Sequence, residues 1–200
     1  MFGVPGKEKR NRFKDNLDAM ISAWSGEPIH RDEEGRQTVL APLPLQRPHP
    51  PLWVAAFGPL ALKQVGGLGL PYLSSPIESL AMLESNYSLH RQAAAEAGKT
   101  LSGTIPVMRT VLITRDAGLA ARVREKLFAT APRHLQGGDI EVEDWAIVGD
   151  PHFARDRLSE YVETLGITHL IGGGRLPAIS ENDQLQSHEW LLDIGTQFAR

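Results

Sequence analysis

The chain contains no cysteine, which excludes disulfide bonds, thiolate metal ligands and a thiol nucleophile. It also has no hydrophobic run near the ~20 residues that a membrane-spanning helix needs. The amino terminus lacks the apolar stretch of a signal peptide. These absences favour a soluble protein of a reducing compartment, so we expect a cytoplasmic location and no membrane partner.

Neither sign of charge predominates. The 21 Lys and Arg residues and 24 Asp and Glu residues give a formal net charge of −3, so the chain has no basic surface for nucleic acid. A length of 200 residues with 42% hydrophobic residues is enough for one domain with its own core and short for two. We therefore expect residues 1–200 to form a single domain.

After a helix over residues 7–24 and a proline-rich extended connector over 27–51, short apolar runs alternate with amphipathic stretches. Residues 131–144 have no clear period, which indicates a loop. This alternation predicts a parallel sheet with crossover helices, either half of an eightfold barrel or a small open α/β sheet. The expected strands cover 52–56, 70–74, 105–114 and 167–171, and the expected helices begin at Pro59, Ile77, Asp116, Pro151 and Ser187.

Two of these expected strands end in small or polar residues. Ala56, Phe57 and Gly58 end the first strand just before a helix, where a ligand's phosphate or ring could approach the backbone. The same residues also suit a plain strand-to-helix turn. Ser74 and Ser75 end the second strand, where their hydroxyls could bind phosphate, although Ser75 equally suits capping of the next helix.

An ordered set of short motifs resembles the luciferase-like monooxygenases, the relatives of bacterial luciferase that use FMN or coenzyme F420. The resemblance extends over nearly the whole chain. In chain order the shared residues are Phe2-Gly3-Val4-Pro5, Arg10-x-Arg12-Phe13, Trp24-x-Gly26, Pro42-x-Pro44-x-Gln46-x-Pro48-x-Pro50-Pro51-Leu52-Trp53-Val54-Ala55-Ala56, Gly69-Leu70-Pro71, Val148-Gly149-Asp150-Pro151 and Leu165-Gly166-Ile167-Thr168-His169-Leu170.

The resemblance implies a TIM (β/α)8 barrel, of which this chain would be the C-terminal half, with about four parallel strands and crossover helices. Members of the family run longer, and their first four strands would precede the helix over residues 7–24. We therefore expect an N-terminally truncated chain: a truncated gene product, a misplaced start or a deliberate fragment.

The resemblance also implies a cofactor site at the strand ends. Arg10 lies where luciferase relatives place an arginine that pairs with the flavin phosphate, although a solvated residue of a charged run is the simpler interpretation. Phe57 departs from the small polar residue often found at its place, which weakens a side-chain phosphate contact there. The candidate cofactor-binding residues are Arg10, Ala56, Phe57, Gly58, Ser74 and Ser75.

The remaining motifs give little evidence of a functional site. Gly172-Gly173-Gly174 lacks the partner residues of a phosphate loop, and we expect it to be a flexible loop after the last strand. His169, within that strand, is expected to be structural. The scattered histidines predict no metal site, and no Gly-x-Ser-x-Gly elbow suggests a hydrolase. No residue is assigned a catalytic role.

The expected function is a flavin-dependent oxidoreductase or monooxygenase, using FMN or F420 on a small organic substrate. The alternative is a non-catalytic flavin-binding or structural half-barrel that associates with another chain. A third interpretation is a small doubly wound α/β domain of unrelated function. Because a half-barrel leaves strand edges unpaired, we expect a homo-oligomer or pairing with a missing N-terminal half.

Overall fold

The computed structural model describes residues 5–132, 140–173, 176 and 179–198. It divides into two compact units, Met1–Leu52 and Trp53–Arg200. Part of the loop expected over 131–144 lies outside the described residues, at 133–139. So do the motif residues 2–4 and 174.

The first unit is built around α1 (Lys9–Trp24), which agrees closely with the predicted helix. Leu17 is its buried residue, and Trp24 packs against His49 with ring centroids 6.0 Å apart. Two residues beyond the helix end, Gly26 has a φ of 88°, which lies in the left-handed region that favours glycine.

The prediction of an extended connector after α1 missed a hairpin. β1 (His30–Arg31) pairs antiparallel with β2 (Gln37–Thr38). The turn between them is fixed by Asp32, whose carboxylate accepts hydrogen bonds from the backbone N–H and the Nε of Arg36 at 2.7 and 2.6 Å. Strands of two residues carry no hydrophobic period, so no pattern in the sequence could reveal them.

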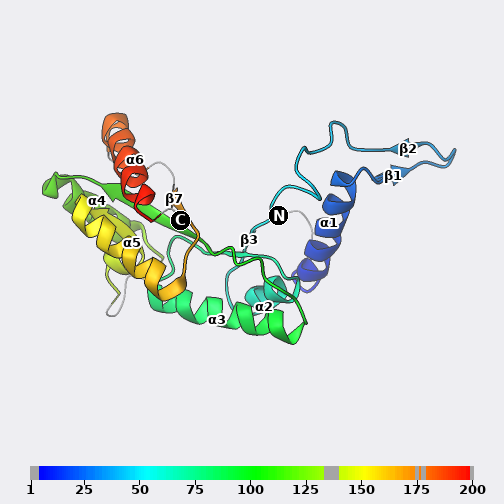
Figure 1. Ribbon diagram of the computed structural model, residues 1–200, viewed down its shortest axis with the longest axis horizontal. Coiled ribbons are helices and arrows are strands. Elements are labelled where there is room, and N and C mark those ends of the chain that lie inside the picture. The colour runs from blue at the N-terminus through cyan, green and yellow to red at the C-terminus, as the bar shows by residue number, and fades with distance from the viewer. Residues whose placement is uncertain (1–4, 133–139, 174–175, 177–178, 199–200) are drawn as a thin grey trace. The chain divides into compact units, whose positions relative to one another are not determined.

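The second unit is an α/β fold, in which the described residues form five parallel strands. β3 (Val54–Ala55) pairs with β4 (Tyr72–Leu73), and β6 (Ala146–Gly149), β5 (Pro106–Ile113) and β7 (His169–Gly173) form a three-stranded sheet in the order β6-β5-β7 (Figure 1). The predicted class, parallel sheets with helical crossovers, is confirmed. The arrangement is a partial barrel.

The two edges of β5 are divided among several elements. Successive N–H groups of a strand point to opposite edges. On one edge the N–H of Met108 donates to the hydroxyl of Ser74, which places the end of β4 beside β5, and the N–H of Thr114 donates to the carbonyl of Gly149 at the end of β6. On the other edge β7 pairs along residues 106–110, and beyond it the N–H of Ile113 donates to the hydroxyl of Ser187.

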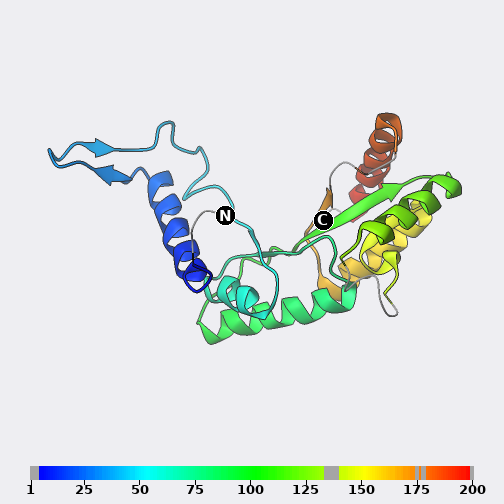
Figure 2. The ribbon, with the colours of Figure 1, turned by 180° about the vertical axis from the view of Figure 1, so that it is seen from behind.

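Helices connect and cover these strands. α2 (Pro59–Gly67) and α3 (Leu80–Glu96) pack on each other, and α4 (Ala117–Thr130) lies beside α5 (Pro151–Leu165) along β5, as seen from both sides (Figures 1 and 2). The last helix is α6 (Glu181–Thr196). Asp116 and Asp150 accept hydrogen bonds from the first turns of α4 and α5, so the helix starts predicted at Asp116 and Pro151 are confirmed to within a residue.

Two further predictions of local structure, a loop and a helix start, were wrong. The segment expected to be a loop ends in a 3-10 helix (Val142–Asp144) that leads into β6, a fully buried strand too short to show a period. The last helix begins at Glu181, six residues before the expected start, because Ser180 and Asp183 form a capping box.

Gly172 and Gly173 belong to β7 and not to a loop. A Cβ on Gly172 would come within 3.0 Å of the Leu191 side chain on α6, and one on Gly173 within 3.1 Å of the Arg109 carbonyl oxygen. The glycines thus permit close packing on both sides of the strand, which is a reason for their presence that needs no ligand.

Two hydrophobic clusters hold the second unit together. The larger lies between the strands and helices α2, α3, α5 and α6, and includes Leu62, Val107 and Tyr161. The smaller lies under α4 and β6 and includes Val123, Trp145 and Val148. Burial of each such side chain contributes roughly 1.5–3 kcal/mol.

Candidate functional site

The ends of β3 and β4 meet at one edge of the second unit. The parallel register pairs Val54 with Tyr72 and Ala55 with Leu73, so the residues that follow, Ala56–Gly58 and Ser74–Ser75, leave the sheet side by side. Five of the six predicted cofactor-binding residues are thereby brought together. Carboxyl ends of parallel strands are where α/β folds bind ligands.

The β3 end leads directly into a helix. Ala56 is buried in the larger hydrophobic cluster, whereas the Phe57 side chain is 61% exposed. Gly58, with φ 81° and ψ 163°, is the N-cap of α2, and no described side chain caps that helix. A Cβ on Gly58 would meet nothing within 4 Å, so the space in front of this helix start is open. An uncapped helix N-terminus favours an anion.

The two serines at the β4 end differ in environment. Ser74 is 2% exposed, and its hydroxyl accepts a hydrogen bond from the N–H of Met108 at 3.1 Å. Ser75 is partly exposed. The interpretation that Ser75 caps the next helix is wrong, because α3 begins at Leu80 and the Ser79 hydroxyl accepts from the N–H of Met82.

Behind the serines lies a buried carboxylate. Glu78 is 1% exposed. Its Oε2 accepts from the N–H of Ser75 at 2.6 Å and from the Tyr72 hydroxyl at 2.7 Å, and its Oε1 accepts from the Asn86 amide at 2.7 Å. All three donors are neutral, so the negative charge is compensated by dipoles.

A buried guanidinium holds the other side of the same peptide. Arg109 on β5 is fully buried, and its Nη1 donates to the carbonyl oxygens of Ser75 and Met108 at 3.2 and 2.8 Å. Its Nε donates to the Tyr161 hydroxyl at 2.8 Å, while Nη2 has no partner among the described residues. The guanidinium also lies 4.9 Å from the centroid of the Tyr161 ring.

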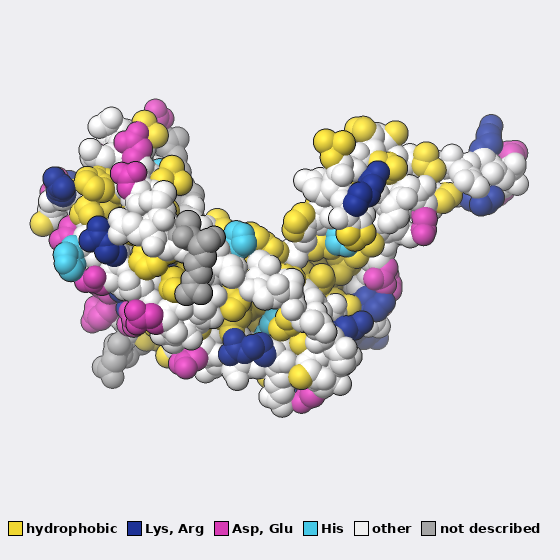
Figure 3. All heavy atoms as spheres, in the orientation of Figure 1, with side chains coloured by type: hydrophobic (Ala, Val, Ile, Leu, Met, Phe, Trp, Pro, Cys, Tyr) yellow, Lys and Arg dark blue, Asp and Glu magenta, His cyan; other side chains and the backbone are white. Residues whose placement is uncertain are grey.

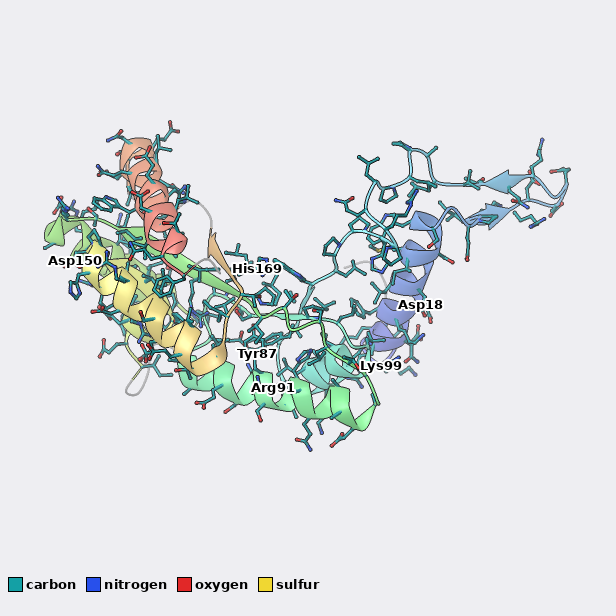
Figure 4. The ribbon with its side chains drawn as sticks, in the orientation of Figure 1. Asp18, Tyr87, Arg91, Lys99, Asp150 and His169 are labelled. Atoms are coloured by element: carbon teal, nitrogen blue, oxygen red, sulfur yellow. The ribbon has the colours of Figure 1, made fainter. Side chains whose placement is uncertain are left out.

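Two tyrosines complete this network. Tyr87 rises from α3 toward the strands (Figure 4), and its hydroxyl donates to the carbonyl oxygens of Pro106 and Tyr72 at 2.7 and 3.3 Å. Burial raises the pKa of Tyr87, an effect that the positive charge of Arg109 opposes. Burial, followed by the hydrogen bond to Glu78, raises the pKa of Tyr72. Both hydroxyls therefore stay protonated and act as hydrogen-bond donors.

Sequence reasoning missed this network. One signal was available, since Arg109 is a lone charge inside the strongly apolar run of residues 105–114. A charge in a buried strand needs partners, and those partners are not adjacent in sequence. Glu78 and Asn86 gave no such signal, because charged and polar residues are ordinary at a helix start and on a helix.

The sixth predicted residue, Arg10, lies on α1 in the first unit, where it is exposed. Among the described residues there is no group of three or more histidine, cysteine, aspartate or glutamate side chains that could hold a metal ion. Within the same residues, no helix is long and apolar enough to cross a membrane.

A separate apolar groove of about 780 Å³ lies beside β7, away from the serines. It runs between the C-terminal halves of α5 and α6, and Leu192 of α6 is largely exposed. Hydrophobic side chains also come to the surface around α6 in the space-filling view (Figure 3). The lining includes Leu158, Val162, Ile167, Leu170, Leu191 and Leu192.

Comparison with known proteins gives a family match over most of the chain. The family model described as luciferase-like monooxygenase matches residues 1–169. Among curated proteins, the oxygenase component of a flavin-dependent trigonelline monooxygenase from Acinetobacter baylyi is 38% identical over 61 residues, which cover 28% of this chain and 17% of that protein.

Solved structures share the fold. The oxygenating constituent of 3,6-diketocamphane monooxygenase from Pseudomonas putida, in complex with FMN, matches with a TM-score of 0.70 and 17% identity, over 94% of this chain and 64% of that one. Coenzyme F420-dependent tetrahydromethanopterin reductase from Methanopyrus kandleri matches with a TM-score of 0.61 and 17% identity, over 92% of this chain and 63% of that one. The chain thus spans less than two thirds of the length of these relatives.

Proposed function

Because the chain belongs to the luciferase-like monooxygenase family, we propose that it serves a flavin-dependent oxidation or reduction, with FMN or coenzyme F420 as the cofactor. The observation that carries the proposal is the meeting of two strand ends, Ala56–Gly58 and Ser74–Ser75, at one edge of a parallel α/β fold beside an uncapped helix start. Relatives of the same fold bind FMN or depend on F420.

The residues at this edge fit the phosphate end of such a cofactor. Pro59 at the first position of α2 has no N–H and the Ala61 N–H donates to the Gly58 carbonyl, so this helix start offers the N–H of Leu60 and a partial positive charge, and Gly58 leaves the approach open. The partly exposed Ser75 can offer its hydroxyl from the neighbouring strand. Ala56 and Ser74, both buried, would shape the site from behind. When bound, the flavin or F420 carries the electrons or hydride, and the protein binds, orients and shields it.

Three further expectations remain proposals: a small organic substrate, a single domain over residues 1–200 and a cytoplasmic location. Arg10 stays a candidate for the phosphate. The choice between FMN and F420 is left to the binding experiment below.

A second candidate function is a flavin-binding or structural partial barrel that works by associating with another chain. One observation favours it: within the described residues, β3 and β7 each pair on one side only. Unpaired strand edges invite another strand, and the apolar groove beside β7 offers hydrophobic surface for it. The partner would be a second copy or a chain that supplies further β/α units. A monodisperse monomer in size-exclusion chromatography with light scattering would overturn this candidate.

The main proposal is tested by titrating FMN and F420 separately into the full chain and following cofactor fluorescence. Riboflavin, which lacks the phosphate, serves as the ligand control. Leu60 is exposed in the first turn of α2, so Leu60→Glu places a negative charge where the phosphate would lie, and Leu60→Gln is its neutral match. We expect Leu60→Glu to weaken FMN binding by about tenfold or more, the equivalent of roughly 1.4 kcal/mol. Absence of saturable binding of either cofactor, or equal effects of the two variants, would overturn the proposal.

A further inference from the structure

We propose that Glu78 and Arg109 are positioning residues that fix the β4 end of the cofactor site from the core side. The inference rests on the proposed function, because it assigns a purpose to the Ser74–Ser75 segment. It concerns residues that would not touch the cofactor. Their effect would pass through the peptide of Ser75.

The geometry is that of a clamp on one residue. Glu78 accepts from the N–H of Ser75 at 2.6 Å, and Arg109 donates to the carbonyl oxygen of Ser75 at 3.2 Å. A charge-assisted hydrogen bond is stronger and more directional than a neutral one. With both of its backbone polar groups held by opposite charges, Ser75 has little freedom to rotate either adjoining peptide.

Neighbouring contacts extend the clamp to the rest of the strand end. The Ser74 hydroxyl is tied to the N–H of Met108, and the Tyr87 hydroxyl donates to the carbonyl oxygen of Tyr72. Glu78 is held in turn by Tyr72 and Asn86, and Arg109 by Tyr161. The side chains of Glu78, Tyr87 and Arg109 thus hold the backbone of Tyr72 and Ser75, and the N–H of Met108 holds the hydroxyl of Ser74 between them.

This arrangement determines what the strand end can offer a ligand. The N–H of Ser75 is committed to Glu78, so a cofactor oxygen would be bound by the side-chain hydroxyl and not by the peptide. The position of that hydroxyl follows from the Ser75 backbone, and so from the two buried charges.

Stability alone is a weak reason for these two residues. No ion pair within 4 Å joins either charge to a described partner, and Arg109 Nη2 is buried without a hydrogen bond. Buried charges are costly, and well-packed apolar replacements are often neutral or stabilising. A positioning role therefore predicts that stability and cofactor binding respond differently to substitution.

The first measurement needs no cofactor. In ¹⁵N-labelled full-length protein, the amide proton of Ser75 should resonate far downfield, because it donates a short bond to a carboxylate. Glu78→Gln keeps the shape of the side chain and removes its charge, and a reoriented Asn86 amide can accept from the new Gln nitrogen. We expect the Ser75 resonance to move upfield by more than any amide outside the network. An unchanged Ser75 resonance would overturn the inference.

The second measurement compares FMN or F420 affinity with the midpoint of urea unfolding for Glu78→Gln, Glu78→Met and Arg109→Met. Glu84→Met, at an exposed position on α3, is the control. We expect Glu78→Met and Arg109→Met to weaken binding by about tenfold, comparable with the loss of residues that support metal ligands, while unfolding stays cooperative. The conservative Glu78→Gln should recover most of this loss.

The outcomes separate the two proposals. If the wild type binds neither cofactor, the proposed function fails, and so does the cofactor role of Glu78 and Arg109. If the wild type binds and Glu78→Met binds equally well, only the positioning role fails. Should Glu78→Met or Arg109→Met not fold, the Ser75 resonance of Glu78→Gln still decides the matter, because an unchanged resonance overturns the positioning role.

Discussion

The indole of Trp53 meets the imidazole of His169 edge to face, with ring centroids 4.9 Å apart and planes at 61°. Trp53 precedes β3, which pairs with β4, and His169 (Figure 4) begins β7, which pairs with β5. The Ser74 hydroxyl after β4 accepts from the N–H of Met108 on β5, so β4 and β5 lie between β3 and β7. Three strand spacings of ~4.8 Å would separate these strands by about 14 Å in a flat sheet. The two side chains bridge part of this distance, and their contact agrees with the curvature of a partial barrel.

The first prediction is that Trp53 and His169 contribute jointly to the free energy of unfolding. Trp53→Ala and His169→Ala should each destabilise the chain, Trp53→Ala by more because the indole is larger. The double variant should lose less free energy of unfolding than the two single variants lose together, and the difference is a coupling energy of roughly 0.5–1.5 kcal/mol. Urea unfolding of the wild type, the two single variants and the double variant completes this double-mutant cycle. His169→Phe, which can keep an edge-to-face contact, is the control. Strict additivity would show that the rings do not interact in solution.

A close helix contact gives the second prediction. A Cβ on Gly66 of α2 would lie 2.4 Å from the backbone oxygen of His90 and 3.0 Å from the Ala93 Cβ on α3. Gly66→Ala must push the helices apart, and we expect a loss of roughly 1–3 kcal/mol in the free energy of unfolding.

The adjacent glycine is the matched control. A Cβ on Gly67 would meet nothing within 4 Å, so Gly67→Ala should be neutral or stabilising by up to roughly 1 kcal/mol, the helix propensity difference. Thermal and urea unfolding of both variants measure the contrast. Equal effects at the two positions would mean that α2 and α3 are farther apart than described.

Much of the second unit was predictable from local patterns. The β-branched run at 105–114, the Asp150-Pro151 helix start and the glycine at 166 gave β5 and both ends of α5 to within a residue or two. These signals act on neighbouring residues: β-branched side chains favour an extended backbone, an aspartate caps the first turn, and Gly166 adopts φ 66° at the helix end.

What could not be predicted depends on residues distant in sequence. Residues 146–149 are an apolar run of four, too short to distinguish a strand from other buried segments, and they form β6 because they pair with the edge of β5 beyond β4. The candidate site shows the same division. The strand ends were recognisable from small residues and a family resemblance, whereas the clamp on Ser75 uses Arg109, 34 residues away.

The third prediction concerns the N-cap of α5. The Asp150 side chain accepts from the N–H of Phe153 at 2.8 Å, which satisfies a donor that the helix itself cannot. Asp150→Ala should cost about 1 kcal/mol of stability, and Asp150→Asn should recover most of it. Asp156 on the same helix is exposed and pairs with His152, so Asp156→Ala should change stability by less than about 0.5 kcal/mol. Equal losses at 150 and 156, measured by urea unfolding, would contradict the capping role.

The last prediction is a dependence of stability on pH that originates at His90. This side chain on α3 is 3% exposed, and its Nε2 donates to the carbonyl oxygen of Leu70 at 2.8 Å. Burial lowers the pKa of His90 below its ordinary value of 6.5, although the hydrogen bond to Leu70 acts in the opposite direction. The folded chain thus holds the imidazole neutral, while the unfolded chain protonates it near its ordinary value.

Between these two pKa values the unfolded state binds more protons, so the free energy of unfolding falls as the pH drops below about 6.5 and levels off above it. His90→Gln keeps an N–H donor for Leu70 and removes the titration. The stability difference between wild type and His90→Gln should therefore shrink from pH 7.5 to pH 5.5, whereas Gln92→Ala, an exposed neutral position on α3, should leave the wild-type profile unchanged. Urea unfolding at intervals of half a pH unit measures this, and a constant difference across the range would show that His90 titrates alike in both states.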